Sequence, residues 1–163
     1  MPAEHPFAPV ADAASHTLIL GSYPSVRSRE EGFYYGHPRN RFWQVLAAVY
    51  GENVPEDVPQ KRALLLGHGL ALWDVIASCR IEGSSDASIR DVTPVPLERI
   101  TATANVRRVI CNGATAGRLF VKHLQPLLPV EPLILPSTSP ANAAWSLERL
   151  TAAWAAALLP PPR

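Results

Sequence analysis

Residues 21–43 read GSYPSVRSREEGFYYGHPRNRFW, and the rest of the chain can be placed around this stretch. It follows a short apolar run, residues 17–20, that stops at Gly21, a pattern typical of a strand buried on both faces. Near its end Asn40 stands where a helix N-cap would, ahead of an apolar helical face that ends at Gly51. Turn-forming residues, aromatic rings and arginines lie between. We therefore predict an active-site loop that joins a buried strand to a helix.

Short apolar runs alternate with helical patterns along the remaining sequence. Further buried strands are predicted at residues 70–76, 106–111 and 133–135. Helical patterns begin near residues 40, 57, 97, 115 and 146. This alternation predicts an α/β fold, a three-layer α/β/α sandwich with a central, mostly parallel four-stranded sheet.

The length of 163 residues and the apolar fraction of 47% favour a single domain with its own core. Residues 1–15 are rich in Pro and Ala without periodicity, so we expect a poorly ordered N-terminal arm. The domain would then span residues 16–159, and residues 160–163 would form a Pro-rich tail. A polar, Ser-rich stretch at residues 79–96 is interpreted as either a functional loop or a disordered one.

The composition excludes several classes of site. The formal net charge of +1 gives no basic footprint over the whole molecule, so any contact with nucleic acid must come from a local patch. The two cysteines, Cys79 and Cys111, are too few for an iron-sulfur cluster and are predicted to be reduced core residues. The five histidines are scattered, and no Walker, GxGxxG or GxSxG motif occurs. We predict no metal and no cofactor.

Polar residues follow the ends of four predicted strands. They are Ser22 and Tyr23, Asp74, Asn112, and the turn at residues 136–139. In parallel sheets, ligands collect at the carboxyl ends of the strands, so these residues are expected to converge on one edge. Neutral polar groups beside aromatic rings suit a flat heterocycle and a water molecule better than covalent catalysis.

Each candidate residue also has an ordinary structural interpretation. Asn40 could be only a helix cap, and Asn112 before a glycine is a common turn pair. Tyr35 could be a half-buried aromatic residue, Asp74 could bind neighbouring loop amides, and His37 before a proline could only shape the loop. The serines at 137 and 139 could form an ordinary turn. The expected convergence of all of them on one sheet edge favours a function.

Three segments give the sequence a family resemblance. YYGHPRNRFW (residues 34–43), VICNG (109–113) and LPSTSPANAAWSLERL (135–150) resemble segments of the uracil-DNA glycosylase superfamily, in the same order. The resemblance covers residues 18–158, and HPRNRFW is its most specific part. It implies base-flipping enzymes that hydrolyse the N-glycosidic bond of a damaged nucleotide.

One motif departs from the common pattern of that superfamily. Its first motif usually reads Gly-Ile-Asn-Pro-Gly, and its asparagine positions the attacking water. Here residues 21–25 read GSYPS, so that asparagine is missing. The GSYPS segment, the asparagine of HPRN, LWDV and the spacing of Ser84, Asp86 and Ile89 resemble the hypoxanthine-DNA glycosylase branch instead.

The resemblance to this branch implies a role for each candidate residue. Asn40 would carry catalysis by positioning water, since an asparagine cannot remove a proton at neutral pH. The other roles are base binding by Ser22, Tyr23, Tyr35 and Asn112, DNA binding by Arg27, Arg39, Ser137, Thr138 and Ser139, and support from Asp74 and His37. Four arginines against two glutamates between residues 27 and 41 would supply the local basic patch.

The sequence therefore predicts a monofunctional DNA glycosylase of base-excision repair that removes hypoxanthine from deoxyinosine. Its partner would be double- or single-stranded DNA, and we expect a monomer without membrane association. Since the sequence has no secretory signal pattern, we expect a cytoplasmic protein, associated with the nucleoid when bound to DNA. The alternatives are a uracil- or mismatch-specific glycosylase of the same fold, a non-catalytic module that binds damaged DNA, and a small-molecule nucleoside hydrolase.

Overall fold

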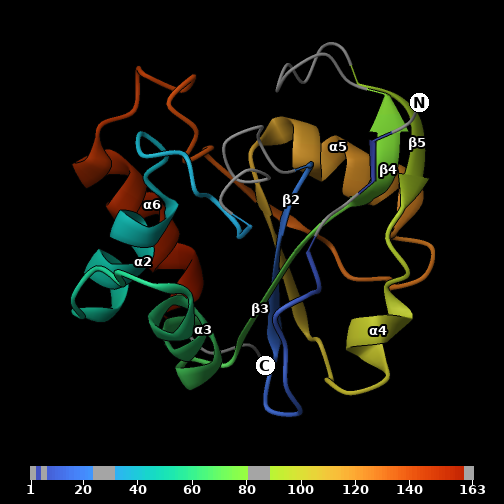
Figure 1. Ribbon diagram of the computed structural model, residues 1–163, viewed down its shortest axis with the longest axis horizontal. Helices are drawn as coiled ribbons and strands as arrows, with labels where there is room; N and C mark the ends of the chain where they lie inside the picture. The colour runs from blue at the N-terminus through green and yellow to red at the C-terminus, as the bar shows by residue number, and fades with distance from the viewer. Residues whose placement is uncertain (1–2, 5–6, 24–31, 81–88, 160–163) are drawn as a thin grey trace.

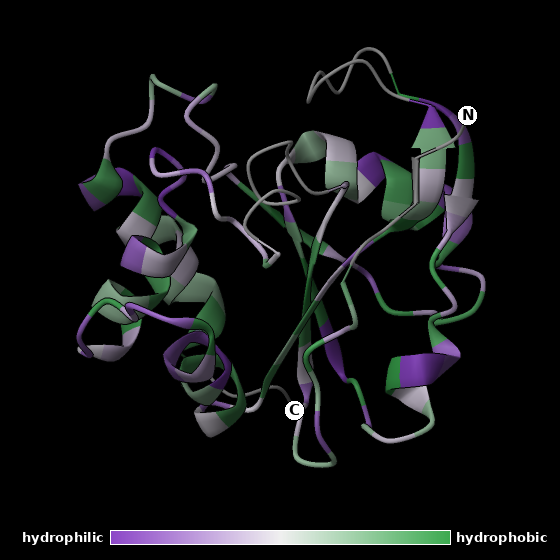
Figure 2. Cartoon of the chain, in the orientation of Figure 1, coloured by the Kyte–Doolittle hydropathy of each residue, from purple (hydrophilic) through white to green (hydrophobic). Residues whose placement is uncertain are grey.

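A sheet of four parallel strands forms the centre of the computed structural model, which describes residues 3–4, 7–23, 32–80 and 89–159. The strand order is β3-β2-β6-β7. The strands are β2 (Thr17–Gly21), β3 (Leu70–Asp74), β6 (Arg108–Asn112) and β7 (Leu133–Leu135). All five residues of β2 and all five of β3 are buried, which explains their nearly continuous apolar sequence. Figure 2 shows this hydrophobic character along the central strands.

Helices cover both faces of the sheet (Figure 1). On one side lie α2 (Phe42–Tyr50), α3 (Val58–Gly67) and α6 (Leu147–Leu158), and on the other lie α4 (Glu98–Thr101) and α5 (Ala114–His123). Helices α2 and α6 pack against each other through Phe42 and Trp154, both fully buried, whose ring centroids are 6.0 Å apart. The predicted three-layer sandwich is confirmed, and every pairing within the central sheet is parallel. No helix in the described part of the chain is long and apolar enough to cross a membrane.

Local signals placed the ends of the helices well. The carboxylate of Asp57 accepts a hydrogen bond from the Gln60 amide at 2.8 Å, and the Ser146 hydroxyl accepts one from the Arg149 amide at 3.1 Å. Gly51 ends α2 in the left-handed conformation, at φ 65°. These residues specify where the helices begin and end, and therefore which loops remain to build the edge of the sheet.

A second, antiparallel sheet departs from the prediction. It contains β1 (Ala3–Glu4), β4 (Ile76–Arg80) and β5 (Arg90–Pro94) in the order β1-β4-β5. We expected one strand over residues 70–76 and a loop over 79–96, but the chain leaves the central sheet after Asp74 and continues into β4. Three of the five β5 residues are exposed, and the β4–β5 register shifts twice, so no regular apolar alternation marks this hairpin in the sequence. Residues 81–88 lie outside the described residues.

The described part of the N-terminal arm packs against the domain. Val10 is fully buried and exchanges two backbone hydrogen bonds with Leu72 of the edge strand β3, at 3.0 and 2.9 Å. The carbonyl of Ala8 accepts a hydrogen bond from the Tyr34 hydroxyl at 2.9 Å. Residues 7–15 therefore differ from the poorly ordered arm that we expected, because they cover the free edge of the sheet.

Both cysteines are buried and neither forms a disulfide, as predicted. Cys79 lies on β4 and Cys111 on β6, and neither side chain is exposed. Burial raises the pKa of the Cys111 thiol to about 12.

Candidate functional site

The carboxyl ends of the central strands bring the predicted residues to one edge. Gly21, the last residue of β2, pairs with Asp74 at the end of β3, and Asn112 at the end of β6 pairs with Leu135 at the end of β7. Ser22 and the 136–139 turn follow directly. The convergence expected from the sequence is therefore present in the structure.

Asn40 and Asn112 are joined at this edge by Thr138. The Thr138 hydroxyl donates to Oδ1 of Asn40 at 2.8 Å, and Nδ2 of Asn112 donates to the same hydroxyl oxygen at 3.0 Å. The backbone amide of Thr138 donates to Oδ1 of Asn112, also at 3.0 Å. Thr138 was predicted to contact DNA, but its exposed fraction is 0%, so the side chain cannot contact a ligand on the surface. It forms the link between the two asparagines instead.

Asn40 caps α2 from one residue before the N-cap position. Its Oδ1 accepts a hydrogen bond from the Phe42 amide at 3.0 Å, while Arg41 occupies the N-cap position itself. We predicted the N-cap at Asn40, one residue before its actual position, but the Asn40 side chain still satisfies a free backbone amide at the helix start. Asn40 is partly exposed, so the capping contact leaves part of its amide group accessible.

Arg41 holds the loop that carries Thr138, a role that the sequence analysis missed. Its backbone amide donates to the carbonyl of Thr138 at 3.1 Å. Its guanidinium group donates to the carbonyls of Ser139, Asn142 and Trp145. One side chain from the start of α2 thus fixes a loop about a hundred residues later. The only hint in the sequence was its position beside Asn40.

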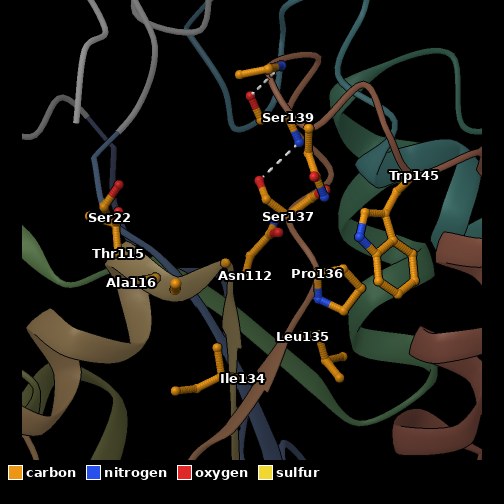
Figure 3. Close-up of a pocket in the computed structure, with 14 residues that line it drawn as sticks. Ser22, Asn112, Thr115, Ala116, Ile134, Leu135, Pro136, Ser137, Ser139 and Trp145 are labelled. Atoms are coloured by element: carbon orange, nitrogen blue, oxygen red, sulfur yellow. Dashed lines mark hydrogen bonds between the residues drawn. The ribbon is translucent and has the colours of Figure 1, made fainter. Parts of the chain in front are cut away.

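A cavity of about 570 Å³ opens at this edge (Figure 3). Four predicted residues line it: Ser22, Asn112, Ser137 and Ser139. Trp145, which was not predicted, forms part of the wall beside Pro136, opposite Ser22.

Other predicted residues lie outside the lining of this cavity. Asn40 and Tyr35 do not line it, and Asn40 is connected to it through Thr138 and Asn112. Tyr23 packs partly buried against the core.

The first turn of α5 also faces the cavity. Residues 114–116 line it, and the preceding Gly113 has a φ of 98° with no side-chain cap on the helix. A Cβ at Gly113 would lie 3.1 Å from the Cβ of Ser137, so both the conformation and the close approach favour glycine. The positive end of the α5 dipole is therefore directed at the cavity, where it favours negative charge.

The Tyr35 hydroxyl and the Asp74 carboxylate both lie close to Gly21. A Cβ on Gly21 would lie 2.3 Å from Oδ1 of Asp74 and 3.0 Å from the Tyr35 hydroxyl. The Tyr35 hydroxyl is buried and has no hydrogen-bond partner among the described residues. Burial first, and then the charge of Asp74, raise the pKa of this hydroxyl, while the side-chain amide of Asn112 opposes the rise as a donor on the hydroxyl's side, beyond 3.5 Å. The Tyr35 ring stacks on Phe42 with centroids 4.1 Å apart, in a left-handed backbone conformation at φ 54°.

The remaining candidates take structural positions or are not described. Nδ1 of His37 accepts a hydrogen bond from the Arg39 amide at 3.0 Å, and the His37 carbonyl accepts one from the Asn40 amide at 2.9 Å, so His37 shapes the loop. The side chain of Arg39 is exposed. Arg27, Ser84 and Asp86 lie outside the described residues. No group of His, Cys, Asp or Glu within the described ranges could hold a metal ion.

Comparisons with known proteins agree on one family. The family model described as the uracil DNA glycosylase superfamily matches residues 8–158. A hypoxanthine DNA glycosylase of Methanosarcina acetivorans is 36% identical over 148 residues, covering 88% of this chain and 90% of the relative. A hypoxanthine DNA glycosylase of Methanosarcina barkeri is 35% identical over 156 residues, covering 93% of this chain and 95% of the relative.

The fold agrees with a solved structure as well. A solution NMR structure of an M. acetivorans protein assigned to the uracil DNA glycosylases superposes with a TM-score of 0.81 and 32% sequence identity, covering 97% of each chain. Family model, relatives and fold thus coincide over nearly the whole chain, and the chain belongs to the uracil DNA glycosylase superfamily.

Proposed function

We propose that this DNA N-glycosylase removes hypoxanthine from deoxyinosine, after flipping the nucleotide out of the DNA, and that it acts as a monomer. The names of the two Methanosarcina relatives support hypoxanthine as the base. The observation that carries the proposal is the fixed amide of Asn112 at the cavity. The reasoning starts from the hydrogen-bonding capacity that this amide retains.

Asn112 uses half of its hydrogen-bonding capacity on Thr138. One lone pair of Oδ1 accepts from the Thr138 amide, and one N–H of Nδ2 donates to the Thr138 hydroxyl. One lone pair and one N–H remain. Since a backbone amide can only donate, Oδ1 and Nδ2 cannot exchange places without losing this contact. The amide therefore offers a ligand an acceptor and a donor in a fixed order.

This order complements a deaminated base. Hypoxanthine presents an N1–H donor beside the O6 acceptor, and adenine presents an N1 acceptor beside an amino donor. In our proposal the base enters with N1 at Oδ1 of Asn112 and its C6 substituent at Nδ2. In that placement the fixed amide pairs with the first pattern and opposes the second, so adenine would leave two mismatched polar groups in the cavity. Deamination of adenine thus produces the pattern that the site can hold.

The reaction then requires water at the sugar. The bond between C1′ and N9 breaks, the base leaves as an anion, and the water oxygen bonds to C1′ while one of its protons passes to the base. In our proposal Nδ2 of Asn40 donates to that water and holds it in place. The positive end of α5 favours the anionic base by about 1 kcal/mol. The exposed Arg39 and the hydroxyls of Ser137 and Ser139 would contact the DNA backbone.

The direct test is base release from defined duplexes. The protein is incubated with duplexes that contain deoxyinosine, deoxyuridine, deoxyxanthosine or only normal bases, and abasic sites are detected by alkaline cleavage. We expect cleavage at deoxyinosine. Absence of release from every damaged duplex would refute the proposed activity. Tight binding to deoxyinosine DNA without release would identify a non-catalytic module instead.

The role of Asn40 needs its own variant. Asn40→Ala should keep its fold, as judged by circular dichroism, and lose most of its single-turnover rate. The control is Gln44→Ala, which also removes an amide side chain from the start of α2, but at an exposed position. A rate near that of the wild type in Asn40→Ala would refute the catalytic assignment even if the enzyme releases hypoxanthine.

Uracil is the second candidate base. The family model and the NMR relative carry its name, and uracil presents an N–H beside a carbonyl just as hypoxanthine does. A cavity of about 570 Å³ is large enough for a purine. Competition between deoxyinosine and deoxyuridine duplexes in one reaction separates the two, and we expect the purine to be processed faster.

A further inference from the structure

The hydrogen bonds around Thr138 can run in only one donor-to-acceptor direction. At one end the Phe42 amide must donate to Oδ1 of Asn40, and at the other the Thr138 amide must donate to Oδ1 of Asn112. Nδ2 of Asn112 then donates to the Thr138 hydroxyl, and that hydroxyl can only donate onward to Oδ1 of Asn40. Backbone amides, which cannot reverse their role, therefore set the direction of the whole chain of hydrogen bonds.

The direction determines what Asn40 offers to a ligand. A carbonyl oxygen has two lone pairs, and both lone pairs of its Oδ1 are used, by the Phe42 amide and the Thr138 hydroxyl. Among the described residues the side-chain hydrogen bonds of Asn40 involve Oδ1 and not Nδ2, and the residue is partly exposed. If the amide rotated by half a turn, one N–H of Asn40 would face the Phe42 amide, which can only donate, and the hydrogen bond that Oδ1 accepts from the Thr138 hydroxyl would be lost. Asn40 therefore presents a donor, and the Thr138 hydroxyl holds it in that orientation.

Thr138 is buried in a loop that several hydrogen bonds hold in place. It is fully buried, and its loop is held by Arg41 and by a hydrogen bond from Nδ2 of Asn142 to the Ser137 carbonyl at 3.0 Å. Its contacts reach the start of α2 and the end of β6. We propose that Thr138 is a positioning residue, which orients Asn40 and Asn112 together and so couples base binding to water placement. This proposal rests on the function proposed above.

The kinetic test compares two substitutions of Thr138. Thr138→Val keeps the shape but has no hydroxyl, and Thr138→Ser keeps the hydroxyl. In single-turnover assays on deoxyinosine duplexes, we expect the valine variant to be slower by about 10- to 100-fold, the effect of one lost buried hydrogen-bond partner, and the serine variant to recover most of the rate. If the valine variant does not fold, Thr138→Ala replaces it with the same expectation. Equal rates for the hydroxyl and non-hydroxyl variants would overturn the proposal.

A double variant separates positioning from simple destabilisation of the loop. If Thr138 acts partly through Asn40, Thr138→Val should slow Asn40→Ala by a clearly smaller factor than it slows the wild type, and the remaining effect passes through Asn112. A merely structural role would slow both backgrounds by the same factor, and that result would contradict the proposal. Gln44→Ala combined with Thr138→Val is the matched control, in which the full effect of the valine should persist.

A measurement without catalysis keeps this inference distinct from the proposed function. In NMR spectra of the free protein, the side-chain amide signals of both Asn40 and Asn112 should shift in Thr138→Val and not in Gln44→Ala. Unchanged asparagine signals would overturn the proposed coupling. If the signals shift but no duplex releases a base, the coupling stands and the proposed reaction fails.

Discussion

Gly21→Ala is expected to disturb the candidate site directly, because the carboxylate of Asp74 occupies the space that a side chain at this position needs. The added Cβ would lie 2.3 Å from Oδ1 of Asp74, against a limit near 3.0 Å for real Cβ contacts. It would also lie 3.0 Å from the Tyr35 hydroxyl. One of these buried groups must therefore move by several tenths of an ångström.

The cost follows from the burial of the groups that must move. Asp74 is 3% exposed and lies on the neighbouring strand in register with Gly21, so its carboxylate cannot turn into solvent. Overpacking of this kind typically costs about 1–3 kcal/mol. For a chain of this size that corresponds to a decrease in Tm of roughly 2–12 °C. Because the Tyr35 side chain interacts with Asn112, the rate of base release should fall as well.

The matched control is Gly67→Ala. Gly67 ends α3, is exposed, and has no atom within 4 Å of the position of an added Cβ. That substitution should be neutral or stabilising by up to about 1 kcal/mol. Unfolding of both variants is followed by differential scanning calorimetry, and base release by the duplex assay. Equal Tm values for Gly21→Ala and the wild type would refute the packing argument.

Three further substitutions test other parts of the site. Tyr35→Phe removes a buried hydroxyl that has no partner among the described residues, so stability should rise by about 1 kcal/mol in urea unfolding; a decrease would mean that the hydroxyl is satisfied. Arg41→Lys keeps the charge but removes the planar guanidinium group that binds three carbonyls. We expect the free energy of unfolding to fall by roughly 1–2 kcal/mol and amide hydrogen exchange in residues 136–145 to become faster. Unchanged exchange would exclude the anchoring role. Burial raises the pKa of the Cys111 thiol from about 9 in the unfolded chain to about 12 in the folded protein. The stabilisation by the protonated thiol is therefore fully present below pH 9 and is lost as the pH rises towards 12. Between pH 9 and 11 the free energy of unfolding of the wild type should therefore fall by up to about 1.4 kcal/mol per pH unit more than that of Cys111→Ala. If the free energies of unfolding of the two proteins fall in parallel over this pH range, the assignment is contradicted.

Local chemistry explains what the sequence predicted well. The unbroken apolar runs of β2 and β3 reflect burial on both faces, and the caps Asp57 and Ser146 mark helix starts through contacts within three residues. The rule that polar loops gather at the carboxyl ends of parallel strands then placed Ser22 and Asn112 together. All of these signals depend on near neighbours in the sequence or on a general property of the fold.

Contacts between distant segments explain what the sequence did not predict. Val10 joins β3 through backbone groups, which leave no trace in the side-chain pattern. The β4–β5 hairpin has register shifts and an exposed strand. Ser137, Thr138 and Ser139 look alike in sequence, yet only the middle residue is fully buried, because Asn40 and Arg41 approach it from about a hundred residues earlier.

The same geometry explains how the chain could manage without an asparagine in its first motif. Tyr23 stands where the resemblance leads one to expect that asparagine, after β2. Asn40 approaches the same edge from the start of α2, and the loop after β7 meets it through Thr138. An amide held by a helix start and a buried hydroxyl has its orientation fixed before any ligand binds, which lowers the cost of arranging the site. In our proposal the feature needed at this edge is an oriented amide, which the fold supplies from a helix start and not from the end of a strand.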